Sequence, residues 1–234
     1  MDLGGSGGGE SDVVIVNAGA TLDATDIVSF TATSATKNNS TNANNAKLTA
    51  KDGGARTIDV SLATGSTVAF KITGVDGADI LTGSSGADII SGGNADDIIY
   101  VAAAGHANSD VIDGGGGSNN VLKLSAGSHT LTTNANLQNI KTIDAHASGS
   151  TLDLTNQSEV FTITGAAGND TIDLGASDNH TDTIIMNLND GLDLIEEFKA
   201  GSSNGDVFKY LGNLTDVEAS ANSSNGSNGS DEIL

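Results

Sequence analysis

The sequence predicts an all-β protein, a right-handed parallel β-helix or β-roll solenoid in which short strands stack coil upon coil. Three contiguous nine-residue blocks fill residues 74–100, and they read GVDGADILT, GSSGADIIS and GGNADDIIY. Each block has Asp at its sixth place and an aliphatic residue at its eighth. Runs of Val, Ile, Thr and Phe recur elsewhere between clusters of Gly, Asn and Ser, which is typical of β-strands. Proline, which would remove a donor from a β-ladder, is absent.

The N-terminal part is expected to be a flexible start at residues 1–11 followed by a β-rich segment at residues 12–71. Strands are expected in this segment at residues 13–16, 27–33, 57–62 and 67–73, with a polar loop at residues 36–46. These strands could begin the solenoid or form a small capping sheet. The sequence leaves both alternatives open.

The nine-residue spacing of the blocks predicts which residues lie above one another on successive coils. If two blocks make one coil, residues eighteen apart lie on successive coils, about 4.8 Å apart. Asp79 then lies beneath Asp97. Two carboxylates at that spacing repel by about 1 kcal/mol at the dielectric constant of water and by several at an effective value near 20. A divalent cation between them would turn this repulsion into attraction.

The same phase places an apolar ladder beside the carboxylates. Leu81, Ile90 and Ile99 each follow their Asp by two residues and are expected to face inward. One repeat therefore supplies both a hydrophobic core and a column of charged oxygen.

The pattern loosens after the third block. Four extra residues precede GHANSDVID (residues 105–113), so Asp88 is expected to stack toward Asp110. The next block, GGGGSNNVL (residues 114–122), has Asn119 at its sixth place, and Asp97 is expected to stack toward that amide.

A second island, GAAGNDTID, restores the pattern at residues 165–173 with Asp170, and Asp182 and Asp193 repeat its second half. Between the islands strands are expected every nine to eleven residues, at 121–124, 130–132, 140–144, 151–154 and 161–164. We therefore expect one continuous solenoid over residues 72–198. Closing strands are expected within residues 192–208, with Ile195 and Phe198 facing inward. A C-terminal cap is expected at residues 199–218, followed by a disordered tail at residues 219–234.

The ligand chemistry of the blocks points to a hard cation. Glycine at the first and fourth places leaves main-chain carbonyls uncovered, and Asp adds charged oxygen. Calcium prefers such an all-oxygen ligand set.

The blocks resemble the RTX nonapeptide G-G-x-G-x-D-x-U-x, and the chain is most similar to the C-terminal parts of bacterial S-layer proteins secreted by the type I route. The resemblance implies a parallel β-roll with several calcium ions bound between its turns. The residues expected to bind calcium are Gly74, Asp76, Gly77, Asp79, Gly83, Gly86, Asp88, Gly92, Asn94, Asp96, Asp97, Asp110, Gly115, Gly117, Asn119, Gly165, Gly168, Asp170, Asp182, Asp190 and Asp193.

Charge and composition exclude other classes of function. The net charge is −21, and residues 72–198 contribute −16 of it through eighteen acidic residues and two lysines. This acidity argues against nucleic-acid binding. Without cations the carboxylate columns oppose compaction, so we expect folding to be coupled to calcium binding. The chain has no Cys for disulfides or thiolate metal sites and no apolar run long enough to span a membrane.

Catalysis is not expected from this sequence. It has neither H-E-x-x-H nor G-x-S-x-G, and its four histidines are scattered. Asp96 and Asp97 are adjacent on the chain, so they point to opposite faces of a strand and do not form a facing catalytic pair.

Three functional classes stay open. The resemblance implies a secreted, calcium-dependent surface protein that assembles with copies of itself into an S-layer or filament, with a surface polysaccharide as a further partner. The chain end, Asp231, Glu232, Ile233 and Leu234, is similar to the acidic and apolar ends of some type I substrates. The alternatives are an adhesin or matrix-binding module and the non-catalytic RTX domain of a secreted enzyme.

Overall fold

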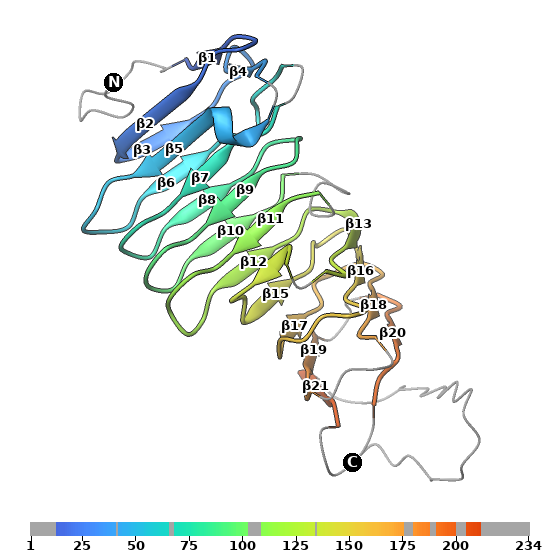
Figure 1. Ribbon diagram of the computed structural model, residues 1–234. Coiled ribbons are helices and arrows are strands. Elements are labelled where there is room, and N and C mark those ends of the chain that lie inside the picture. The colour runs from blue at the N-terminus through green and yellow to red at the C-terminus, as the bar shows by residue number, and fades with distance from the viewer. Residues whose placement is uncertain are drawn as a thin grey trace, which may run out of the picture.

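The computed structural model describes residues 13–40, 42–65, 68–102, 109–133, 135–175, 180–187, 191–199 and 205–211. Over these residues the chain is a parallel β-solenoid, as predicted from the repeats. Figure 1 shows its short strands as stacked rungs that progress from the N-terminal end to the C-terminal end. In this part of the chain no helix is long and apolar enough to cross a membrane.

The strands form one long sheet and three shorter ones, and every strand pair described is parallel. The nine-stranded sheet contains, from its N-terminal edge, β3 (Ser29–Thr31), β6 (Thr57–Asp59), β8 (Ile80–Thr82), β10 (Ile98–Tyr100), β12 (Val121–Lys123), β15 (Thr142–Asp144), β17 (Thr162–Thr164), β19 (Thr183–Asn187) and β21 (Val207–Leu211).

The six-stranded sheet contains β2 (Leu22–Ile27), β5 (Ala46–Ala50), β7 (Lys71–Thr73), β9 (Ile89–Ser91), β11 (Val111–Asp113) and β14 (Leu137–Gln138). The four-stranded sheet contains β13 (Gly127–Thr130), β16 (Ser150–Asp153), β18 (Thr171–Asp173) and β20 (Leu194–Glu196). The two-stranded sheet pairs β1 (Ile15–Val16) with β4 (Lys37–Asn38), and a short 3-10 helix, η1 (Ala43–Asn45), precedes β5.

The coil length varies along the solenoid. Asp79 and Asp97 occupy equivalent places on successive coils and are 18 residues apart, as the two-block phase predicts. The next step, from Asp97 to Asn120, takes 23 residues, and the step from Ser150 to Asp170 takes 20. The extra residues lie in the turns, because the strands keep their register.

The hydrophobic core is built from columns of aliphatic side chains. Ile99 of β10 lies between Leu81 of β8 and Leu122 of β12, and all three are fully buried. Ile90 continues the equivalent column of the six-stranded sheet. The predicted inward orientation of Leu81, Ile90 and Ile99 is therefore confirmed. Burying one such side chain stabilises the fold by about 1.5–3 kcal/mol.

The strands before the repeats are hydrogen bonded into the same sheets. β3 and β6 precede β8 in the nine-stranded sheet, and β5 and β7 precede β9 in the six-stranded sheet. Of the two alternatives that the sequence left open for this segment, the structure has the start of the solenoid. The polar stretch at residues 36–46 is not only loop, since it contains β4 and η1.

The C-terminal strands differ in one respect from the expectation. Ile195 of β20 packs against the core, but Phe198 is 38% exposed, so its predicted inward orientation is wrong. β20 ends at Glu196, and Glu197 has a left-handed backbone with φ of 57°. The alternation of the strand therefore does not extend to Phe198.

Candidate metal centre

The sixth-place aspartates lie where each turn enters a strand, and they join successive coils. The main-chain N–H of Arg56 donates to Asp79 Oδ1 at 2.6 Å, and that of Asp79 donates to Asp97 Oδ1 at 2.7 Å. The main-chain N–H of Asp97 in turn donates to Asn120 Oδ1 at 2.8 Å. Each side chain thus uses one oxygen to hold the preceding coil.

The same hydrogen bond recurs on the other turns that the structure describes. The further pairs of donor N–H and accepting carboxylate are Phe70 to Asp88, Asp88 to Asp110, Ser150 to Asp170, Asp170 to Asp193, Phe161 to Asp182 and Asp182 to Asp206. Asp206 was not among the predicted residues. It stands directly before β21 just as Asp79 stands directly before β8, which is the signal that could have identified it.

The second carboxylate oxygen of Asp79 and of Asp97 is the chemically distinctive feature of this site. The two side chains are 1% and 0% exposed, and their Oδ2 atoms are buried without a hydrogen-bond partner. Burial, and then the charge of nearby Asp97, raise the pKa of Asp79 to about 6. Burial likewise raises the pKa of Asp97 to about 6. A carboxyl group buried in this position must either be protonated or have its negative charge compensated by a cation.

A first-place glycine leaves room beside each of these oxygens. An added Cβ at Gly74 would lie 2.6 Å from Asp79 Oδ2 and would collide with the carbonyl oxygen of Gly92 on the next coil. An added Cβ at Gly92 would lie 2.5 Å from the carbonyl oxygen of Gly114 and would collide with Asp97 Oδ2. Each space is therefore bordered by a carboxylate oxygen and by a carbonyl oxygen from the following coil.

Other predicted glycines let the turns pack main chain against main chain. An added Cβ at Gly77, Gly115, Gly117 or Gly168 would meet the backbone of the preceding coil. Gly77 also has a left-handed φ of 106°, a conformation that glycine adopts without strain. Gly86 donates its N–H to Ser84 Oγ at 3.2 Å within its own turn.

These observations fit a calcium ion. No group of three or more His, Asp or Glu side chains that could hold a metal occurs in the part of the chain that the structure describes. A cation here must therefore take ligands from main-chain carbonyls as well as from Asp, and calcium is bound in that way in proteins. Asp79 and Asp97, with the carbonyls of Gly92 and Gly114, are the residues that would hold it.

The outer part of the same turns carries a different set of polar residues. Asn94 Nδ2 donates to Asp76 Oδ1 at 2.6 Å, which links two predicted ligands across adjacent coils. Asp96 accepts the N–H groups of Ser118 and Asn119, and these hydrogen bonds lower its pKa. These side chains lie on the exposed face of the turn, apart from the buried column.

The predicted stacking of Asp97 on Asn119 is wrong by one residue. The strand register places Val121 opposite Ile98, so Asn120 takes the place above Asp97 while Asn119 bonds to Asp96. This turn has one residue more than a nine-residue block, so counting from its glycines ends one position too early. The predicted stacking of Asp88 on Asp110 is confirmed, because Ile89 pairs with Val111.

Asp88, on the opposite turn, is more fully bonded than Asp79 and Asp97. Its Oδ1 accepts the N–H of Phe70, and its Oδ2 accepts the N–H of Ser84 at 2.5 Å. Burial nevertheless raises its pKa to about 6. Burial, and then the charge of Asp88, raise the pKa of Asp110 to about 8.

The second island offers a different environment. An added Cβ at Gly165 would collide with the Met186 sulfur, and Asp170 Oδ2 lies 3.5 Å from that position. A thioether is a poor ligand for calcium, so this space fits the ion less well than the spaces at Gly74 and Gly92. Asp182 and Asp193 take part in the ladder described above, whereas Asp190 lies outside the described residues.

The fold and this site define the class: a parallel β-solenoid that binds cations between its turns. The family model described as RTX calcium-binding nonapeptide repeat (4 copies) matches residues 73–103 and 162–182. These two segments are similar to RTX nonapeptide repeats, which bind several calcium ions. Both predicted islands of the pattern lie at these segments. The RTX repeat is a structural, non-catalytic motif that occurs in secreted proteins.

No curated protein and no solved structure gave a significant match to this chain.

Proposed function

We propose that this chain is a calcium-dependent structural protein of the bacterial cell surface, which folds on secretion and assembles with copies of itself into an S-layer or filament. The observation that carries the proposal is the pair of buried, unpartnered oxygens of Asp79 and Asp97 in a column with glycine carbonyls. An ion at this position compensates a charge of the core itself, so it contributes to folding rather than to a reaction.

Calcium levels connect this chemistry to location. Flexible extracellular calcium modules bind the ion with dissociation constants of about 10⁻⁴ to 10⁻³ M. Such sites are loaded outside the cell and not at cytosolic calcium levels. A chain of net charge −21 that folds only after export would also remain extended during transport, which supports a secreted role.

The edges of the long sheet support self-assembly. Among the described strands, β3 and β21 are the outer strands of the nine-stranded sheet. An outer strand offers main-chain N–H and C=O groups to a strand of another chain. Apolar side chains are exposed near both edges, with Val28 42% exposed at one end and Leu211 62% exposed at the other. End-to-end association of copies would cover them.

Sedimentation analysis of the chain over a range of concentrations, with millimolar calcium or with a chelator, tests this proposal. We expect large assemblies with calcium and unassembled chains with chelator. A chain that folds with calcium yet stays monomeric at every concentration would contradict self-assembly and favour the adhesive module.

A further inference from the structure

The carboxylate column that begins at Asp79 changes chemistry at Asn120. Asn120 is 2% exposed, and its Oδ1 accepts the N–H of Asp97 just as Asp97 Oδ1 accepts that of Asp79. The hydrogen bond between coils is therefore kept. Only the second atom of the side chain differs, an amide nitrogen in place of a carboxylate oxygen.

This nitrogen borders the space that corresponds to the proposed cation position one coil earlier. An added Cβ at Gly114 would lie 2.7 Å from Asn120 Nδ2 and would collide with the carbonyl oxygen of Asn139. At Gly92 the same space is bordered by Asp97 Oδ2 and the carbonyl oxygen of Gly114. Asn120 Nδ2 donates directly to Asn139 O at 3.0 Å, and to Gly116 O at 2.9 Å. The amide thus bridges to the next coil without an ion.

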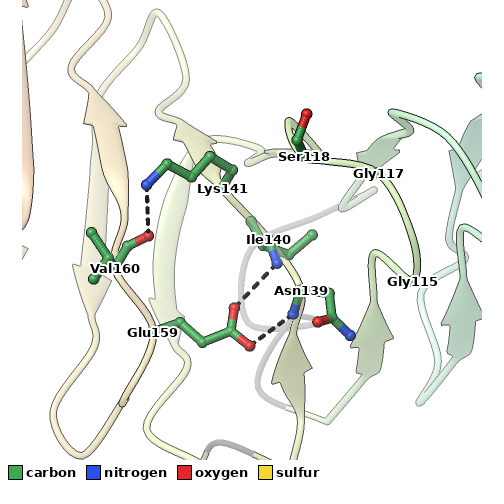
Figure 2. Close-up of a pocket in the computed structure, with 8 residues that line it drawn as sticks. All are labelled: Gly115, Gly117, Ser118, Asn139, Ile140, Lys141, Glu159 and Val160. Atoms are coloured by element: carbon green, nitrogen blue, oxygen red, sulfur yellow. Dashed lines mark hydrogen bonds between the residues drawn. The ribbon is translucent and has the colours of Figure 1, made fainter.

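On the coil beyond Asn120, a carboxylate accepts main-chain hydrogen bonds at the equivalent turn. Figure 2 shows Glu159 accepting the main-chain N–H groups of Asn139, at 2.8 Å, and of Ile140, at 3.2 Å. The residue before β15, which continues the column, is Lys141, whose Nζ lies 3.4 Å from Val160 O. The place that Asp79 and Asp97 take on earlier coils is thus taken by a lysine whose ammonium group makes an exposed hydrogen bond to a main-chain carbonyl, so no carboxylate stands at this level of the column.

We propose that Asn120 terminates the calcium column, its amide replacing the ion that bridges a carboxylate and a carbonyl on the preceding coils. The inference rests on the proposed calcium sites at Asp79 and Asp97. It predicts that the identity of one atom at this position decides whether the coil takes a metal, because Asn and Asp have the same shape and the acceptor Oδ1 is common to both. Asn120→Asp therefore creates a site, and Asp97→Asn removes one while keeping the coil closed.

The number of bound calcium ions, counted by native mass spectrometry and by calorimetry on the full chain, tests the inference. We expect Asn120→Asp to bind one ion more than the original chain and Asp97→Asn to bind one ion fewer. Asn17→Asp is the matched control, since it makes the same change from amide to carboxylate on an exposed turn away from the column. We expect it to leave the number of ions unchanged.

The outcomes separate the inference from the function on which it rests. If the original chain binds no calcium, the proposed function itself is contradicted. If the original chain binds calcium but Asn120→Asp gains no ion, or Asn17→Asp gains as many, the inference alone is overturned. Should Asn120→Asp fail to fold, Asp97→Asn decides: one ion fewer with an unchanged circular dichroism spectrum supports the inference, and an unchanged count contradicts it.

Discussion

The main-chain N–H of Asp79 donates to Oδ1 of Asp97, 18 residues later, at 2.7 Å, while the other oxygen of Asp97 lies buried without a hydrogen-bond partner. The two oxygens of one carboxylate therefore have different tasks. One closes a coil onto the next, and the other is the oxygen that we propose binds a cation. This division explains how a column of acidic side chains can belong to the core of a folded protein.

Replacing Asp79 tests both tasks. Asp79→Ala removes the acceptor of the Arg56 N–H and also one oxygen of the proposed calcium site. We expect a loss of about 1–3 kcal/mol of stability from the unsatisfied donor, in addition to a weaker response to added calcium. Asp52→Ala, on the exposed turn before Arg56, is the control and should change neither quantity. Equal effects of the two variants on urea unfolding would contradict the proposed column.

Gly92→Ala tests the space beside Asp97. The added methyl group would collide with Asp97 Oδ2 and come within 2.5 Å of Gly114 O, so we expect weaker calcium binding and a lower melting temperature in calcium. Gly116→Ala is the control, because its nearest neighbour is a flexible side-chain atom, Asn94 Oδ1, at 3.2 Å. A Gly92→Ala protein that binds calcium like the original chain would show that this space holds no ion.

The raised pKa values predict an unusual pH dependence without metal. Asp79, Asp88 and Asp97 have folded pKa values of about 6 against 3.8 in the unfolded chain, and Asp110 has one of about 8. The folded state therefore binds these protons more tightly than the unfolded state. Their contribution to stability is complete below about pH 4 and is lost as the pH rises through 6 and 8.

We accordingly expect the urea midpoint in chelator to fall between pH 5 and pH 8.5. Calcium competes with protons for the same oxygens, so in calcium the midpoint should fall less or should rise over the same range. A midpoint in chelator that stays level or increases with pH would count against buried carboxylates at these positions.

The apolar ladder should contribute to stability independently of the ions. Ile99 is fully buried between Leu81 and Leu122, so Ile99→Ala should cost about 2–5 kcal/mol in calcium-loaded protein without altering the number of ions bound. Ile80, which is 40% exposed on a neighbouring strand, is the control, and its replacement by Ala should cost less. Chemical denaturation with calorimetric ion counting measures both effects, and a changed ion count for Ile99→Ala would refute their independence.

The sequence predicted the fold and the central column because three blocks keep unbroken nine-residue phase. That phase alone places Asp79 on Asp97 and Leu81 on Ile99, and the structure has both pairs. Where a turn contains extra residues, counting along the chain from its first glycine gives the wrong position for the residue that precedes the strand. Asn119 was therefore expected in the place that Asn120 takes, and aligning the strand residues Ile98 and Val121 would have avoided the error.

Other features of the site depend on contacts that no spacing rule contains. The Ser84 N–H on Asp88, and the Met186 side chain beside Gly165, come from the way that neighbouring turns pack. Asp206 is the sixth residue of GSSNGDVFK (residues 201–209), which has Gly at its first place and lacks only the fourth-place glycine. The nine-residue pattern could therefore also have identified Asp206, which stands directly before a strand. The difference between the two oxygens of Asp79 and of Asp97, one accepting a main-chain N–H and one buried without a hydrogen-bond partner, also required coordinates.

Calcium titration of the chelated chain at pH 7.5, followed by far-ultraviolet circular dichroism and by calorimetry, tests the central claim most directly. If ions compensate the buried column, β-structure should form cooperatively over the range of about 10⁻⁴ to 10⁻³ M calcium, with uptake of several ions per chain. An unchanged spectrum together with no heat of binding would contradict the account.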